Sequence, residues 1–230
     1  MKVVILQPSY IPWRGYFDQI RRADLFIFYD DVQYDRRSWR NRNQIKTHTG
    51  KQWLTIPVFS RGAQTQNIPI NEIRIVWDQP WNQQHYKALQ YAYASAPYFK
   101  QFQPLLADFY NRKDEYLADF TIDFSVALAR ELGIAHTRFM RSSEIDGITG
   151  QKTDRLIQIL KHAGASHYIS GPSAKDYIEE GKFRAANITL EFMEYNYPDY
   201  PQLYPPYDPF VSVLDLLFMT GSNALKYIEG

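Results

Sequence analysis

Basic and aromatic side chains are concentrated in one short segment near the N-terminus. Arg36, Arg37, Arg40, Arg42 and Lys46 lie within residues 36–46, together with Trp39, Asn41 and Asn43, and Tyr34 lies just before them. Guanidinium groups match the oxygen pairs of phosphate and carboxylate, and aromatic rings stack on a base, a sugar or another guanidinium. The segment therefore predicts a polyanionic ligand that contains a ring. The residues expected to contact it are Arg36, Arg37, Trp39, Arg40, Asn41 and Arg42.

A second group of candidates follows the first apolar run of the chain, residues 3–6. The loop of residues 7–17 leads into a stretch with helical spacing at 14–23, and a helix N-terminus favours negative charge. The side chains expected to contact a ligand there are Gln7, Tyr10, Trp13 and Tyr16. The alternative is that Trp13 and Tyr16 only pack the loop.

Two carboxylates and one histidine are the candidates for proton transfer. Asp30 and Asp31 end the second apolar run, and adjacent strand residues point to opposite faces, so at most one of them is expected to face the ligand. We predict Asp30 as a base, Asp31 as a ligand contact, and a pairing of one of them with an arginine of residues 36–40. His85 is the other predicted base, because an imidazole titrates near neutral pH. A packed or solvent-exposed histidine is the alternative.

Two further sets lie in the second half of the chain. Residues 170–177, SGPSAKDY, predict a turn into a short helix with Ser173 as its N-cap. Its expected ligand contacts are Ser170, Gly171, Ser173 and Lys175, although the Walker spacing is absent and a simple capped turn is the alternative. Tyr200 and Gln202 form the last candidate pair, in the Pro- and Tyr-rich stretch 197–209. The sequence at 212–215 predicts a cap for the last helix.

Composition excludes several classes of site. The chain has no cysteine, so disulfides, thiolate nucleophiles and Cys-ligated metals are absent, and its five histidines lack metal-binding spacing. We therefore predict no metal site. The net charge is only +1, which argues against general binding of nucleic acid. No apolar run is long enough to span a membrane, and we expect a cytoplasmic protein without membrane insertion.

The order of apolar runs predicts an α/β fold. Runs at 3–6 and 25–29 flank the helical stretch 14–23 and form a βαβ unit, which implies a parallel sheet. Further strands are predicted at 52–58, 73–77, 137–140, 167–170 and 188–195, the first two as hairpin-like additions to the sheet. Helices are predicted at 153–163 and 212–219, and a mainly helical stretch at about 79–132. We expect one domain, 1–230, with a three-layer Rossmann-like, mainly parallel sheet, helices on both faces and a helical insertion.

The turn from the first apolar run into the helical stretch 14–23 is similar to the strand-to-helix turn of nucleotidyltransferases. Residues 13–16 stand where adenylyl- and cytidylyltransferases carry two histidines, and those histidines are absent here. A nucleotidyltransferase-like fold is therefore expected, while nucleotidyl transfer itself is only an alternative function.

Four motifs in order resemble the WbqC-like protein family over essentially the whole chain. They are MKVVILQPSYIPWRGYF, the block from YDDVQYDRRSWRNRNQIK to WLTIPV, YISGPSAKDYI, and the ending from YPDYPQ to FVSVLDLLFMTG. The resemblance implies a cytoplasmic bacterial or archaeal protein of surface-polysaccharide (O-antigen) biosynthesis, and it assigns no catalytic residue.

Together, these observations predict a transferase that N-acylates or aminoacylates an amino sugar carried on a nucleotide diphosphate. Because the chain offers no nucleophilic cysteine or GxSxG serine, we expect the acceptor amine to attack a bound thioester or acyl phosphate directly. The donor we name is an acyl thioester of coenzyme A or of an acyl or peptidyl carrier protein. One alternative is a non-catalytic protein that binds a sugar nucleotide or a carrier. Another is a binder of single-stranded nucleic acid, which the sequence pI of 7.8 disfavours.

Overall fold

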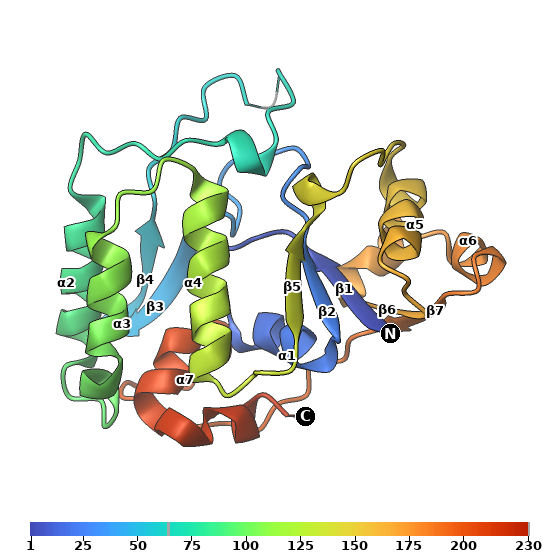
Figure 1. Cartoon of the computed structure of the whole chain (residues 1–230). Coiled ribbons are helices and arrows are strands. Elements are labelled where there is room, and N and C mark those ends of the chain that lie inside the picture. Colours follow the sequence, from blue (N-terminus) through green and yellow to red (C-terminus); the bar gives the residue numbers. More distant parts are fainter. Residues whose placement is uncertain (64, 230) are drawn as a thin grey trace.

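A five-stranded parallel sheet forms the centre of the computed structural model, which describes residues 1–63 and 65–229 (Figure 1). Its strand order is β5-β2-β1-β6-β7. The strands are β1 (Lys2–Leu6), β2 (Leu25–Phe28), β5 (Arg138–Arg141), β6 (His167–Ser170) and β7 (Thr189–Phe192). The chain builds outward from β1 through β2 to β5 and then returns to place β6 against the other side of β1. The strand order therefore reverses between β1 and β6, which confirms the Rossmann-like α/β prediction.

Alternate strand residues enter two separate cores. Val4 and Phe26 are buried in the larger core, whereas Val3 and Leu25, their neighbours along the strands, are buried in the smaller one. Strands that are buried on both faces need continuous apolar runs, which is why the sequence revealed these strands.

Helices cover both faces of the sheet. The smaller core lies under α5 (Lys152–His162) and α6 (Glu180–Ala185). The larger core includes α1 (Arg14–Arg22), α4 (Leu117–Glu131) and α7 (Val213–Thr220). Figure 1 shows α5 and α6 on one side of the sheet and α4 on the other. Among the described residues, every helix is too short or too polar to cross a lipid bilayer.

The larger core continues from the sheet into a second layer of helices. That layer contains α2 (Trp81–Tyr93) and α3 (Phe99–Asn111), which pack beside α4 and the antiparallel hairpin of β3 (Arg42–Thr47) and β4 (Gly50–Thr55) (Figure 1). The helical stretch expected at 79–132 is therefore three helices. Short 3-10 helices complete the chain: η1 (Ile70–Glu72), η2 (Ser142–Glu144), η3 (Pro172–Asp176) and η4 (Gly221–Tyr227).

Three local predictions were wrong. The hairpin strands pair only with each other and do not extend the main sheet. Residues 73–77 form no strand, because Arg74 and Ile75 make only isolated bridges, to Tyr116 and Val58. At 170–177 the turn begins with Gly171 as N-cap, so that Ser173 lies inside η3 and caps nothing.

Candidate ligand-binding site

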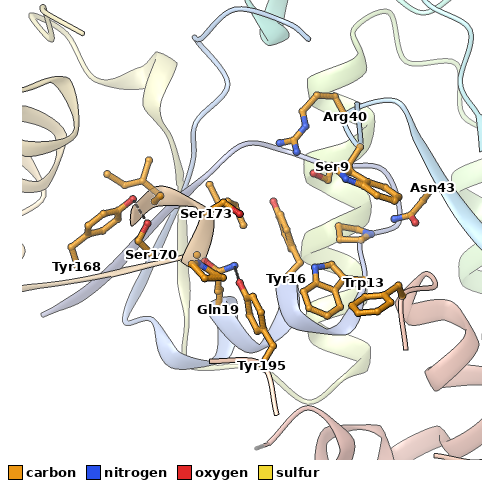
Figure 2. Close-up of a pocket in the computed structure, with 18 of the residues that line it drawn as sticks. Ser9, Trp13, Tyr16, Gln19, Arg40, Asn43, Tyr168, Ser170, Ser173 and Tyr195 are labelled. Atoms are coloured by element: carbon orange, nitrogen blue, oxygen red, sulfur yellow. Dashed lines mark hydrogen bonds between the residues drawn. The ribbon is translucent and has the colours of Figure 1, made fainter. Parts of the chain in front are cut away.

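A cavity of about 480 Å³ opens at the carboxyl ends of β1 and β6, where the strand order reverses (Figure 2). Open α/β sheets bind ligands at this position, because the loops after two neighbouring strands diverge there. Four segments line it: the loop and first turns of α1 after β1, the basic segment at 39–43, the η3 turn after β6, and side chains at 195 and 210.

Arg40 brings positive charge into the cavity without a direct ion pair. Its Nε and Nη1 atoms are buried and have no hydrogen-bond partner, and no carboxylate of the described residues forms an ion pair with it. Burial lowers the pKa of Arg40, although an arginine remains protonated at neutral pH. Burying donors without partners costs free energy, and the hydrogen bonds of an anionic ligand would offset that cost. Arg40 is therefore the strongest anion-binding group of the site.

Hydrogen bonds to backbone atoms hold the Arg40 segment against the loop that follows β1. Trp39 O accepts from Tyr10 N at 3.1 Å, and Asn43 Nδ2 donates to Tyr10 O at 3.1 Å and to Ile11 O at 2.9 Å. Asn43 is buried and itself lines the cavity. The basic segment and the first loop therefore face one cavity, although they are far apart in sequence.

Aromatic rings form much of the cavity wall. The Trp13 ring lies edge-on to Tyr195, with centroids 4.9 Å apart, and 6.0 Å from the ring of Phe210. Tyr16 lies beside them and donates its hydroxyl to Gln7 O at 3.2 Å. Burial raises the pKa of Tyr16, so that it remains an uncharged phenol at neutral pH. Trp39 extends the wall at the mouth, where it is half exposed. Such walls suit a flat or cyclic ligand.

The turn after β6 contributes hydroxyl groups and a glycine. Ser170, Gly171 and Ser173, three of the four expected ligand contacts of this turn, line the cavity. Ser170 Oγ donates to Tyr168 OH at 3.4 Å, and a Cβ on Gly171 would lie 3.5 Å from Tyr195 OH. Lys175 does not line the cavity, because its Nζ lies over the ring of Phe192.

Gln19 is a lining residue that the sequence reasoning missed. It is 4% exposed, its Nε2 donates to Tyr195 OH at 3.0 Å, and its Oε1 has no partner. Gln19 follows Tyr16 by three positions, which places both on one face of α1, and that spacing was the available signal. Ser9, Asn43, Tyr195 and Phe210 were missed as well, and their positions depend on tertiary contacts.

Asp30 and Asp31 hold neighbouring elements together and do not line the cavity. Asp30 is fully buried, accepts from Arg141 Nε at 2.6 Å and from Ser143 Oγ at 2.9 Å, and so joins the ends of β2 and β5. Asp31 pairs with Arg155. The expected pairing with an arginine of residues 36–40 was therefore wrong, because these partners lie at the adjacent strand edge and on α5.

His85 and Tyr10 lie in the buried core. Tyr10 OH is 2.8 Å from His85 Nδ1 and 2.6 Å from Tyr110 OH. Burial lowers the pKa of His85 to about 4, and the residue does not line the cavity. The placement gives no support to His85 as a base for a ligand bound there.

The remaining candidates also lie outside the lining. Arg36 and Arg37 are exposed, and Gln7 contributes its backbone oxygen to Tyr16. The Arg42 guanidinium lies 4.3 Å from the ring centroid of Trp53.

Three other polar candidates have structural partners. Asn41 Nδ2 donates to Ile56 O at 2.8 Å. Tyr200 and Gln202 belong to a separate polar network, in which Gln202 Nε2 donates to Asp215 Oδ1 at 3.0 Å.

Groups that bind metals or transfer protons are scarce at the site. No cluster of three or more His, Cys, Asp or Glu side chains suited to a metal ion occurs within residues 1–63 and 65–229. The described lining contains no histidine, carboxylate or lysine. The arrangement can hold an anion, stack a ring and form neutral hydrogen bonds.

A family model and a known protein match nearly the full length of this chain. The sequence model of the WbqC-like protein family matches residues 7–227. The uncharacterized protein Rv1507c of Mycobacterium tuberculosis (strain ATCC 25618 / H37Rv) is 40% identical over 230 residues, covering 99% of this chain and 97% of that protein. No solved structure matches this chain.

Proposed function

The chain belongs to the WbqC-like protein family, and we propose that it is a transferase of surface-polysaccharide biosynthesis. Its substrate is an amino sugar linked to a nucleoside diphosphate, bound in the cavity between β1 and β6. The reaction is transfer of an acyl or aminoacyl group to the sugar amine from a thioester of coenzyme A or of a carrier protein.

The Arg40 guanidinium carries this proposal, because its Nε and Nη1 atoms are buried without a partner. Buried N–H donors of a cation that lacks a direct ion pair are unfavourable, and a diphosphate supplies paired oxygens that match the guanidinium geometry. The cavity volume of about 480 Å³ lies within the range of sites for small molecules and cofactors. The rings of Trp13, Tyr16 and Trp39 offer stacking surfaces for a base or a sugar.

Calorimetric titration with UDP, dTDP and GDP and with their amino-sugar conjugates tests the proposal. Arg40→Met keeps most of the side-chain length but removes the charge, and we expect the affinity of the best ligand to fall about ten- to a hundredfold. The unliganded variant should be at least as stable as the wild type, because it no longer buries an unpaired charge. Arg37→Met is the matched control, since Arg37 is exposed and outside the lining. Binding that is insensitive to Arg40 refutes the proposal.

The composition of the lining favours a second candidate, a non-catalytic protein that holds the sugar nucleotide for another enzyme. A carboxylate, histidine or lysine to move a proton is missing from the described lining. Incubation of the protein with a bound amino-sugar nucleotide and acetyl-coenzyme A or an acylated carrier protein, followed by mass spectrometry, separates the two. A product larger by one acyl group supports the transferase, and tight binding with no such product supports the binding protein.

A further inference from the structure

Two buried polar groups of opposite character lack partners in the cavity. Among the buried side-chain atoms without a hydrogen bond in the described chain, only those of Arg40 and Gln19 belong to lining residues. Arg40 offers N–H donors, and Gln19 offers the acceptor Oε1. In Figure 2 Arg40 lies above and Gln19 below, with Tyr16 between them in this view. A ligand that satisfies both has an anionic group and, separated from it, a hydrogen-bond donor.

A hydrogen bond to Tyr195 positions the carboxamide of Gln19. Gln19 lies on α1 and is 4% exposed, and its Nε2 donates to Tyr195 OH at 3.0 Å, which leaves Oε1 as the free acceptor. Burial raises the pKa of Tyr195 to about 12, so the phenol is uncharged at neutral pH. Since the Tyr195 oxygen already accepts from Gln19, its own proton is available to a ligand. The pair presents one acceptor and one donor, and neither carries a charge.

We propose that Gln19 is the specificity-determining residue of this site and accepts a hydrogen bond from the uncharged amine of the bound sugar. This inference rests on the proposed function and names the part of the substrate that Gln19 recognises. An ammonium group would find no carboxylate in the described lining and would share the cavity with the Arg40 cation. Asp18, whose charge contributes to the raised pKa of Tyr195, is fully buried outside that lining and is already paired with Arg21 and Arg22. Desolvation and repulsion both favour the neutral amine.

A neutral amine held in this way is ready for acyl transfer. Its N–H points to Gln19 Oε1, and its lone pair stays free to attack the thioester carbonyl. The C–N bond forms, the C–S bond breaks, and the proton lost by the amine ends on the leaving thiolate, which departs as a thiol. Gln19 acts as a positioning residue and supplies no proton, which is consistent with a lining that contains no base.

The pH dependence of binding tests this proposal, with UDP-glucosamine and UDP-glucose as one matched pair and a dTDP-linked aminodeoxyhexose and its hydroxyl counterpart as another. Between about pH 6 and about pH 9, where amines of this kind lose their proton, we expect the affinity for the amino sugar to rise. The affinity for the hydroxyl sugar should not follow that curve. An amino-sugar affinity that falls with rising pH overturns the proposal, because it would show recognition of the ammonium form.

Three variants sharpen the test. Gln19→Leu removes the acceptor and should weaken the amino sugar about tenfold while leaving UDP or dTDP alone unchanged. Gln19→Glu places a carboxylate opposite the amine and should invert the pH profile, so that binding is tightest at low pH. Gln101→Glu, on an exposed position of α3, controls for the added charge.

The outcomes separate this inference from the proposed function. If Gln19→Leu weakens UDP or dTDP as much as the amino sugar, Gln19 contacts the nucleotide or only shapes the site, and the inference is wrong while the function stands. If no nucleotide of either series binds through Arg40, the proposed function fails and this inference fails with it.

Discussion

The indole ring of Trp13 lies against the α-carbon of Gly15, so closely that a Cβ added to Gly15 would come within 2.3 Å of ring atom Cζ2. Trp13 is the N-cap of α1, and Gly15 lies in the first turn of that helix. Only hydrogen fits between the backbone and the ring. Gly15 therefore permits the position of the indole that forms one wall of the cavity.

Replacement of Gly15 by alanine should displace the Trp13 ring from the cavity wall. We expect Gly15→Ala to weaken nucleotide-sugar binding about tenfold, roughly the energy of one aromatic stacking contact. Stability should change by no more than about 1 kcal/mol, because the gain in helix propensity opposes the strain of moving the ring. Calorimetry and urea unfolding measure the two effects.

A second helical glycine provides the control. A Cβ on Gly181 of α6 would have Arg184 Nη2, at 3.9 Å, as its nearest neighbour, so Gly181→Ala should leave binding unchanged. Equal binding by Gly15→Ala and the wild type would show that the indole is not a ligand contact.

Asp30 and Arg141 join the carboxyl ends of two adjacent strands. The Asp30 carboxylate is completely buried and accepts from Arg141 Nε at 2.6 Å and from Ser143 N at 3.1 Å. Removal of one partner from such a pair leaves the other charge poorly solvated. Asp30→Ala should therefore lower the free energy of unfolding by about 3 to 5 kcal/mol, measured by urea denaturation.

An exposed ion pair tests the role of burial. Asp123 contacts Arg112 at 2.7 Å but is half exposed, and Asp123→Ala should lower stability by less than about 1 kcal/mol. The folded fraction of Asp30→Ala should bind the nucleotide diphosphate normally, since Asp30 lies outside the lining. Similar losses of stability in the two variants would contradict the structural role given to Asp30.

The central strands could be predicted because burial on both faces demands continuous apolar residues. The runs at 3–6, 25–29 and 167–170 correspond closely to β1, β2 and β6. The polar strand β3 could not be predicted in this way, since Arg42–Thr47 contains little apolar surface. Tertiary contacts stabilise it: Lys46 N donates to Tyr93 OH at 3.0 Å, and Ser212 N donates to Gln44 O at 2.9 Å.

The sequence indicated the position of the cavity more reliably than it identified the side chains that line it. The loops after β1 and β6 meet because parallel strands share one carboxyl edge, so that Trp13, Tyr16, Ser170 and Ser173 could be anticipated. Composition could not show which arginine turns inward. That depends on the local backbone, including a φ of 58° at Arg37. Whether these residues bind a ligand remains a prediction.

The buried imidazole of His85 should make stability depend on pH. Desolvation lowers its pKa from 6.5 to about 4 in the folded protein, and Tyr10 OH lies 2.8 Å from Nδ1. The unfolded chain therefore takes up a proton first as the pH falls. The free energy of unfolding is therefore unaffected by His85 above pH 6.5. As the pH falls from 6.5 to about 4, protonation of His85 in the unfolded chain lowers the free energy of unfolding by about 3 kcal/mol.

Urea denaturation across that pH window, on the wild type and on His85→Gln, measures this contribution. Glutamine does not titrate, so the variant should show a smaller loss of stability on acidification. His162→Gln, at an exposed position of α5, should retain the wild-type dependence. Parallel curves for the wild type and His85→Gln would mean that the imidazole is solvated in the native state.

Gln202 ties the Pro- and Tyr-rich segment 197–209 to the core. Its Oε1 accepts from Lys46 Nζ at 2.7 Å and from Asp208 N at 2.9 Å, and its Nε2 donates to Asp215 Oδ1 at 3.0 Å. Burial raises the pKa of Asp215, and the hydrogen bond from Gln202 opposes that rise. Phe210 follows this segment and lines the cavity, so that the network also positions part of the site.

Gln202→Ala removes these bonds together and should lower stability by about 2 to 3 kcal/mol. Hydrogen exchange should accelerate at residues 197–210 more than in the parallel sheet, and nucleotide-sugar binding should weaken by less than for Arg40→Met, because Phe210 forms only one part of the wall. Gln101→Ala, exposed on α3, serves as the control. Unchanged hydrogen exchange at 197–210 would show that aromatic packing alone holds the segment. That packing includes the rings of Tyr200 and Tyr207, whose centroids lie 5.5 Å apart.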